Sequence, residues 1–173
     1  MKYFAYGSNM LTERLQDRVP SAKNPRLLAL PKHRLRFHKK STDCSGKCNI
    51  VPTACDGDVV HGVLFEIDDA QMSTLDDHEG VGYRRNEITV WLDGTETKVC
   101  VYVAEKDAID DALLPYRWYC DLVLAGAEQQ RLPRDYVAGL RAIPFTRDPK
   151  PNRKTRLKAL DVLRKYKESK KMA

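Results

Sequence analysis

The sequence has no long hydrophobic run. None of its apolar stretches approaches the roughly 18 residues that a helix needs to cross a bilayer. The first residues also lack the long apolar core and the small-residue cleavage site of a signal peptide. We therefore expect no membrane partner and a cytoplasmic location.

Cysteine is infrequent and odd in number, at five residues. Because we expect no export, free thiols are favoured over disulfides. The spacing of these cysteines, even with the histidine upstream of them, matches no familiar zinc-binding pattern, so we expect no metal. The residues concerned are His38, Cys44, Cys48, Cys55, Cys100 and Cys120.

Several catalytic motifs are also missing. No Gly-Lys-Ser or Gly-Lys-Thr sequence is present, which argues against a nucleotide-binding P-loop. A serine hydrolase is disfavoured because there is no Gly-x-Ser-x-Gly motif. A cysteine hydrolase would need Cys44 or Cys48 beside a histidine, yet the loop around both is polar.

What remains is a chain of ordinary globular composition. Its 173 residues fit one domain, with 42% hydrophobic and 31% charged residues. The net charge of +6 is concentrated at the end, because from Arg147 onward there are 11 Lys or Arg against 3 Asp or Glu. The part before Arg147 is slightly acidic, which is not the pattern of a nucleic-acid-binding domain.

The basic tail, residues 146–173, has two interpretations. Its density of positive charge would support weak, salt-dependent contacts, and a non-catalytic protein that binds nucleic acid or another acidic surface is one alternative. Its regularly spaced apolar residues favour instead a helix over 154–167 that packs on the body or on a second copy of the chain, as in a homodimer. These apolar residues are Leu157, Leu160, Leu163 and Tyr166.

Hydropathy and turn signals place strands early and helices late. This order favours an α+β fold with a curled, mostly antiparallel or mixed sheet. A strand over 26–38 is expected to bend at Pro31 and to lead into a polar loop over 39–47, and Asp93-Gly94 predicts a hairpin turn. The other predicted strands are 2–6, 49–53, 59–67, 84–92 and 97–103, and the predicted helices are 10–17, one ending at His78, 116–128, 134–142 and 154–167.

A short loop, Tyr6-Gly7-Ser8-Asn9, joins the first predicted strand to the first predicted helix. A glycine here allows a tight turn that points successive N–H groups into one small space, where they attract a phosphate or a carboxylate. The alternative is an ordinary strand–turn–helix corner capped by Ser8 or Asn9.

A second segment, residues 75–80, places three carboxylates in the last turn of a helix. The helix dipole and the neighbouring like charges disfavour negative charge there, which suits a carboxyl group that exchanges a proton as a general base or acid. The alternative is a solvated acidic helix end that stops at Gly80. His78 is adjacent to Glu79 but is expected to point elsewhere on the helix.

Together, Tyr3-Phe4-Ala5-Tyr6-Gly7-Ser8-Asn9-Met10 and Leu75-Asp76-Asp77-His78-Glu79-Gly80 resemble the signature pair of the γ-glutamylcyclotransferase-like family. The resemblance continues through Gly126-Ala127, Leu132-Pro133, Asp135-Tyr136 and Leu140-Arg141-Ala142-Ile143, and covers residues 1–145. The Tyr-Gly-Ser-Asn form resembles the broad branch of the family more than the glutathione-specific branch, whose loop usually has leucine at the fourth position.

This resemblance implies a catalytic domain over 1–145, followed by the tail over 146–173, which we expect to pack on the same domain. It implies an α+β fold with a small, β-barrel-like, mixed or antiparallel sheet, surrounding helices and no cofactor. The catalytic glutamate corresponds to Glu79. A pocket tyrosine matches Tyr102, while Tyr83 and Tyr119 match less closely and Tyr116 competes with Tyr119. The implied substrate-binding residues are Tyr3, Phe4, Ala5, Tyr6, Gly7, Ser8, Asn9, Tyr83, Tyr102 and Tyr119.

The implied reaction is an intramolecular aminolysis of a small γ-glutamyl substrate. The α-amine of the γ-glutamyl group attacks its own γ-carbonyl and closes the five-membered ring of 5-oxoproline, and Glu79 moves the proton. The leaving group stays open: it is an amino acid, or, in an enzyme of the same fold, another amine or a biosynthetic intermediate.

Overall fold

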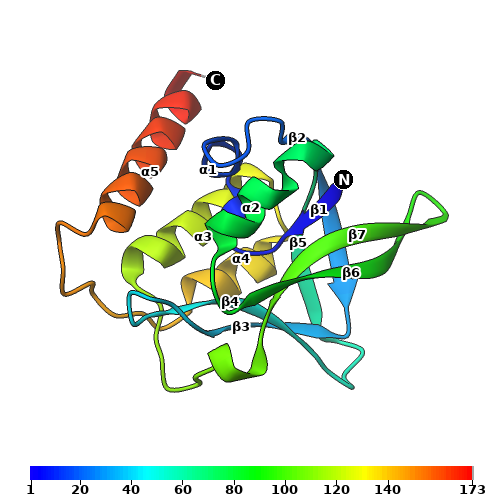
Figure 1. Cartoon of the computed structure of the whole chain (residues 1–173), viewed down its shortest axis with the longest axis horizontal. Helices are drawn as coiled ribbons and strands as arrows, with labels where there is room; N and C mark the ends of the chain where they lie inside the picture. Colours follow the sequence, from blue (N-terminus) through cyan, green and yellow to red (C-terminus); the bar gives the residue numbers. More distant parts are fainter. Residues whose placement is uncertain (173) are drawn as a thin grey trace.

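The first strand of the chain lies at the centre of the main sheet. The computed structural model describes residues 1–172, and in it β1 (Lys2–Ala5) pairs antiparallel with β5 (Val59–Glu66) and parallel with β7 (Thr95–Ala104). β2 (Lys23–Pro31) lies beside β5, and β6 (Tyr83–Leu92) lies beside β7, which completes the order β2-β5-β1-β7-β6 (Figure 1). The predicted α+β class with a mixed sheet is therefore confirmed.

The sheet is not a closed barrel. β2 and β6 are its two edge strands, and a separate antiparallel pair, β3 (His33–Lys40) and β4 (Gly46–Pro52), contacts β5 and β7. The single bent strand expected over 26–38 is wrong, because Lys32 adopts a left-handed φ of 56° between β2 and β3 and sends the chain into the second sheet. Strand β3 also extends into the predicted polar loop.

The predicted hairpin of β6 and β7 is confirmed. The strands pair antiparallel from Tyr83 with Ala104 to Leu92 with Thr95. Asp93 and Gly94 between them have φ values of 51° and 78°, and two positive values in succession match the right-handed twist of a tight hairpin.

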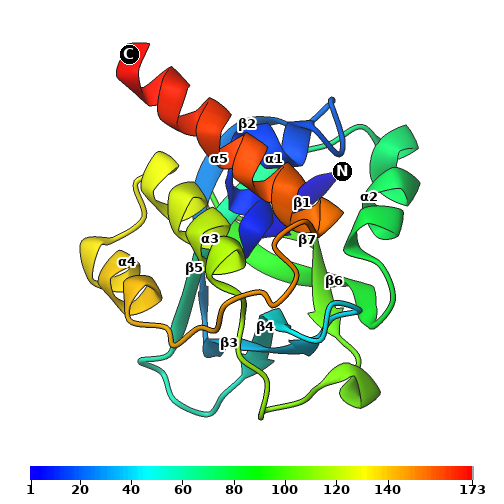
Figure 2. The same ribbon diagram turned by 90° about the vertical axis from the view of Figure 1, so that its left-hand side faces the viewer.

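Helix α3 (Arg117–Gln129) lies in front of the main sheet in the view of Figure 2, with α4 (Arg134–Arg141) beside it. α3 packs on the turn after β1, and Gly126 permits this because a Cβ atom there would lie 2.5 Å from the backbone nitrogen of Leu11. None of the helices in residues 1–172 has the length and apolar composition needed to cross a membrane. The elements, with three single 3₁₀ turns, are η1 (Ser8–Met10), α1 (Thr12–Gln16), η2 (Asp69–Gln71), α2 (Met72–Glu79), η3 (Lys106–Ala108), α3 (Arg117–Gln129) and α4 (Arg134–Arg141).

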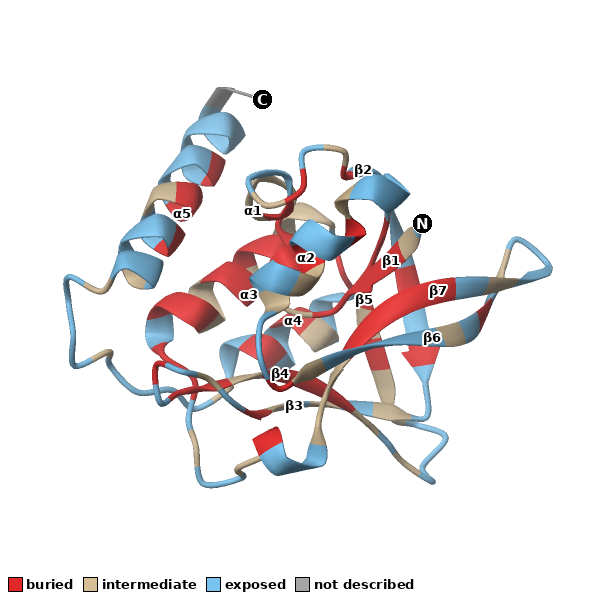
Figure 3. Ribbon diagram, viewed as in Figure 1, coloured by how far each residue is buried: buried red, intermediate tan, exposed pale blue. Residues whose placement is uncertain are grey.

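The tail forms α5 (Lys154–Met172), which packs on α1 and α3. Its apolar stripe differs in part from the predicted one: Leu157 and Leu160 remain 48% and 39% exposed. The contact is made instead by side chains three and four residues apart on the face toward the body (Figure 3), as expected for a surface helix. They are Ala159, Val162, Leu163 and Tyr166.

Candidate active site

Glu79 is the last residue of α2, one residue beyond the predicted helix end at His78. The helix stops because Gly80 has a φ of 72°, and buried Leu75 anchors the preceding turn to the core. Of the three carboxylates in this turn, only that of Glu79 faces the cavity described below, and its side chain is 14% exposed. Asp77 is exposed, and Asp76 pairs with Arg85 at 3.2 Å.

A hydrogen-bonded network holds one oxygen of this carboxylate. Asn9 Nδ2 donates to Glu79 Oε1 at 2.6 Å and also to the hydroxyl of Tyr3 at 3.0 Å. Arg18 Nη1 donates to Asn9 Oδ1 at 3.0 Å and lies 3.3 Å from Glu79 Oε1. Because Arg18 engages the amide oxygen, the amide nitrogen must face the carboxylate. Within residues 1–172, Glu79 Oε2 has no hydrogen-bond partner, which leaves it open to a ligand.

Glu79 lies on a small cavity of about 30 Å³, called here the inner cavity. Eight of the ten residues predicted to bind substrate line it, but Phe4 and Ala5 do not. Phe4 points to the other face of β1, where its ring packs against Gly62, and Ala5 is buried in the core. The lining is Tyr3, Tyr6, Gly7, Ser8, Asn9, Cys48, Glu79, Tyr83, Tyr102 and Tyr119.

The tyrosine hydroxyls of the cavity are held in place by the surrounding chain. Tyr102 donates to Asp76 Oδ1 at 2.7 Å, Tyr83 donates to the carbonyl of Cys48, and Tyr119 accepts from the N–H of Cys48 at 3.1 Å. Burial raises the pKa of all three, so they remain neutral at physiological pH.

The two tyrosines that compete for one pocket position are separated by the structure. Tyr119 lines the inner cavity. Tyr116 precedes α3 by one residue, and its hydroxyl donates to the carbonyl of Asp43 at 2.9 Å, away from that cavity.

Glycine is required at position 7 because Cys48 and Tyr119 lie close to its Cα atom, and not because the backbone there is left-handed. Its φ is −123°, but a Cβ atom would lie 3.1 Å from the Cβ of Cys48 and 3.3 Å from the hydroxyl of Tyr119. The expected capping by Ser8 or Asn9 is absent from η1. Ser8 Oγ instead accepts from Arg14 Nε at 3.0 Å, and Asn9 bonds Glu79.

A larger hollow of about 400 Å³, the outer pocket, adjoins the inner cavity. The two share Ser8, Glu79, Tyr83 and Tyr119. His78, expected to point elsewhere, lines the outer pocket but not the inner cavity. The charged groups around the outer pocket are mostly basic: Arg14, Arg18, Lys39, Lys47, Arg153 and Lys154 against Asp43 and Glu79.

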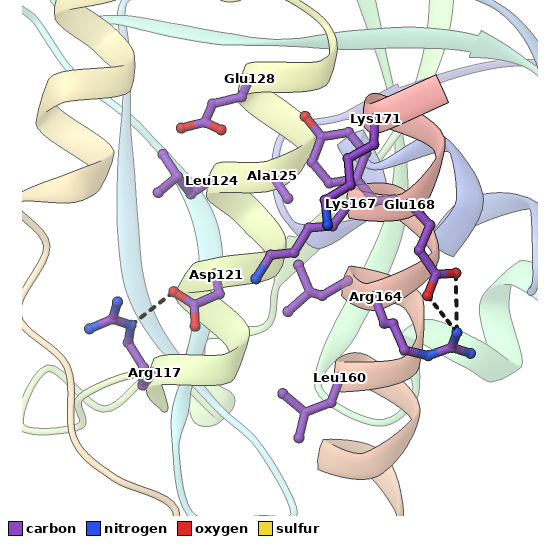
Figure 4. Close-up of a pocket in the computed structure, with 12 residues that line it drawn as sticks. Arg117, Asp121, Leu124, Ala125, Glu128, Leu160, Arg164, Lys167, Glu168 and Lys171 are labelled. Carbon is purple, nitrogen blue, oxygen red and sulfur yellow. Dashed lines mark hydrogen bonds and ion pairs between the residues drawn. The ribbon is translucent and has the colours of Figure 1, made fainter. Parts of the chain in front are cut away.

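The hollow between α3 and α5 is larger, at about 580 Å³, but none of the predicted site residues lines it (Figure 4). Within that hollow, Arg117 pairs with Asp121 and Arg164 pairs with Glu168. We therefore place the candidate active site at Glu79 and not at this larger hollow.

Comparison with known proteins gives the family. The AIG2-like family model matches residues 59–140, from β5 into α4. The γ-glutamylcyclotransferase of Bos taurus is 32% identical over 149 residues, which cover 82% of this chain and 77% of the bovine protein. This chain belongs to the γ-glutamylcyclotransferase family.

Solved structures of the family agree with this assignment. A γ-glutamyl cyclotransferase structure aligns with a TM-score of 0.82 and 28% identity, covering 95% of this chain and 98% of its own. A yeast γ-glutamyl cyclotransferase specific to glutathione has the same fold but only 12% identity and a TM-score of 0.54. These values accord with the predicted place in the broad branch of the family.

Two residues of this candidate site were not found from the sequence. Arg18 contacts Glu79, and its only local signal is its spacing of four residues from Arg14 after the loop. Cys48 lines the inner cavity, and burial raises the pKa of its thiol to about 12, which argues against a cysteine nucleophile. Residues 1–172 contain no cluster of three or more His, Cys, Asp or Glu side chains placed to hold a metal.

Proposed function

We propose that this enzyme of the γ-glutamylcyclotransferase family cyclises the γ-glutamyl group of small γ-glutamyl substrates to 5-oxoproline, with Glu79 as its general base and acid. The observation that carries the proposal is the state of the Glu79 carboxylate. Asn9 and Arg18 hold Oε1, while Oε2 has no partner within residues 1–172, and the Glu79 residue lines both the cavity and the pocket.

The position of the substrate follows from the sizes of the two spaces. The inner cavity, at about 30 Å³, admits only a small end of a γ-glutamyl group. The turn of Gly7, Ser8 and Asn9 lines it, and the first N–H groups of a helical turn lack intrahelical acceptors, so the α-carboxylate fits there. The γ-carbonyl then lies near Glu79, where the cavity meets the pocket, and the leaving group extends into the outer pocket.

The reaction requires one proton acceptor that later becomes a donor. Glu79 Oε2 takes a proton from the α-ammonium, and the freed amine attacks the γ-carbonyl to form the new carbon–nitrogen bond. The same carboxyl group then gives this proton to the leaving nitrogen as the original amide bond breaks. The second proton on the new ring nitrogen passes by way of the Glu79 carboxylate to the released amine, so the products are a neutral lactam and an ammonium group. The attacking amine and the carbonyl belong to the same molecule. Little translational and rotational entropy is therefore lost when they come together, and the main task left to the enzyme is proton transfer.

Asn9 and Arg18 act in this proposal as positioning residues. Asn9 ties the carboxylate to the substrate loop through its 2.6 Å hydrogen bond. Arg18 lies 3.3 Å from the same carboxylate oxygen and also donates a hydrogen bond to Asn9, so it fixes the positions of both side chains.

The experiment that tests the proposal is the release of 5-oxoproline by a Glu79→Gln variant. Glutamine keeps the size of the side chain but cannot take up the proton, so kcat should fall by about 10²–10⁴-fold while the melting temperature stays near that of the wild type. Asp77→Asn is the matched control, because Asp77 lies in the same helical turn but is exposed. Wild-type kcat in Glu79→Gln would disprove the role of Glu79.

A further inference from the structure

Arg14 lies in the wall of the outer pocket without an acidic partner. Its Nε donates to Ser8 Oγ at 3.0 Å, and no carboxylate within residues 1–172 forms an ion pair with it. The burial of the guanidinium and the adjacent charge of Arg18 lower the pKa of Arg14 to about 9, which leaves it protonated at neutral pH. A positive charge that is partly desolvated and unpaired is stabilised by an incoming anion.

Lys39 is a second cation of this kind. Its side chain belongs to a residue only 5% exposed, and Nζ donates to the carbonyl of Val81 at 2.7 Å. The ammonium also lies 4.6 Å from the centre of the Tyr83 ring. No carboxylate pairs with it in the described chain, and burial lowers its pKa, an effect that a bound anion would oppose.

Most other basic groups of the pocket already have acidic partners. Arg18 pairs with Glu79, Lys47 pairs with Asp43 at 2.9 Å, and Arg153 pairs with Asp148 at 2.8 Å. Lys154 is exposed to solvent. Two desolvated positive charges, those of Arg14 and Lys39, are therefore left for a ligand.

Both cations stand where the pocket meets the inner cavity. Arg14 bonds Ser8, and Lys39 lies over the ring of Tyr83. Ser8 and Tyr83, like Glu79, line both the inner cavity and the outer pocket. A group joined to the γ-carbonyl beside Glu79 would enter the outer pocket, whose wall contains both cations. They come from different elements, α1 and β3, so they can contact different parts of one ligand.

We propose that the outer pocket selects leaving groups that carry two carboxylates, such as an acidic amino acid, and that Arg14 and Lys39 are the residues that recognise them. The inference rests on the proposed function, since it names the leaving group of the same reaction. Two negative charges would balance the two unpaired cations, whereas an amine without a carboxylate would leave both cations unpaired in a poorly solvated wall.

The test compares γ-glutamyl-glutamate with γ-glutamyl-glutamine, which has the same shape and one carboxylate fewer. Wild-type protein should show a kcat/KM about tenfold or more higher for γ-glutamyl-glutamate, as expected for a charge-assisted contact. Of Lys39→Gln and Arg14→Gln, the variant that removes the partner of the side-chain carboxylate should bring the ratio of the two kcat/KM values close to one. The other variant removes the partner of the α-carboxylate, which both substrates carry, and should lower both kcat/KM values about tenfold or more. Both kcat/KM values of a variant are measured on one preparation, so a lower fraction of folded protein reduces both equally and leaves their ratio unchanged.

Lys40→Gln is the matched control, because Lys40 is the next residue of β3, exposed and outside the pocket lining. It should keep the wild-type ratio. A wild-type ratio of one, with both substrates converted, would overturn the inference and leave the proposed function intact. A ratio that neither pocket variant changes would also overturn it. If no γ-glutamyl compound yields 5-oxoproline, the proposed function fails and the subsite fails with it.

Discussion

At the scale of single residues, Asn9 connects the two sequence segments on which the proposed mechanism depends. Its amide group bonds Glu79, seventy positions further along the chain, and the hydroxyl of Tyr3. Arg18 prevents the amide from turning over, because only the amide oxygen can accept its hydrogen bond. The proposed general base is thereby held by the same loop that lines the proposed binding site of the α-carboxylate.

Gly7 gives a prediction at this scale. In Gly7→Ala the new methyl group would lie 3.1 to 3.3 Å from Cys48 and from the hydroxyl of Tyr119, so the wall of the inner cavity must shift. We expect KM for a γ-glutamyl substrate to rise several-fold, measured by steady-state release of 5-oxoproline. Gly139→Ala is the control, since a Cβ atom in that helix would meet nothing within 4 Å. An unchanged KM in Gly7→Ala would contradict this account of the cavity.

At the scale of elements, the connector between α4 and α5 is held by one carboxylate. Asp148 has a side chain only 1% exposed, and it accepts hydrogen bonds from Arg153, from Trp118 Nε1 and from the backbone of Lys150. Burial alone would raise the pKa of Asp148, but these donors, with Arg153 foremost, outweigh it and lower the pKa to about 2.

The depressed pKa predicts an acid-sensitive contribution to stability. A carboxyl group with a lowered folded-state pKa stabilises the fold above its unfolded-state value near 3.8, and this contribution is lost as the pH falls toward about 2. Asp148→Asn should lower the free energy of unfolding by about 1–2 kcal/mol at pH 7, and by progressively less below pH 4.

Urea unfolding at pH 7 and at pH 3 measures this difference. Asp161→Asn is the control, because Asp161 also pairs with Arg164 and Lys165 but at the exposed surface of α5. We expect no measurable change in that variant. An Asp148→Asn variant as stable as the wild type at pH 7 would show that the connector does not depend on this carboxylate.

At the scale of the whole molecule, the basic tail is packed on the body through one face of α5. Leu163 is 7% exposed in that contact, whereas Leu157 is 48% exposed on the same helix. The start of the tail also borders the outer pocket through Arg153, Lys154 and Thr155. The division into a domain over 1–145 and a tail over 146–173 stays a prediction, as does a homodimer.

A matched pair of substitutions tests the packing of the tail. Leu163→Ala should lower the free energy of unfolding by about 2–3 kcal/mol, because it opens a cavity between α5 and the body. Leu157→Ala removes the same atoms from a mostly exposed position and should change stability by less than about 0.5 kcal/mol. Chemical denaturation of both variants gives the comparison, and equal effects would mean that α5 does not pack as described.

Sequence by itself determined the features that depend on neighbouring residues. The Asp93-Gly94 hairpin, the end of α2 at Gly80 and the loop after β1 follow from local backbone preferences, which consecutive residues carry. The same holds for the resemblance of the two segments around Gly7 and Glu79 to one family, because each segment is a short continuous motif.

Tertiary structure alone decided which distant groups meet. The sequence could not place Arg18 beside Glu79, choose Tyr119 over Tyr116, or bring Arg14 and Lys39 to one pocket mouth, because each depends on packing between separate elements. The division of the predicted strand at Lys32 has the same origin. β2 pairs with β5 and β3 pairs with β4, and these two sets of hydrogen bonds stabilise two strands in different sheets more than one continuous strand. Local preferences are weak against such long-range pairing.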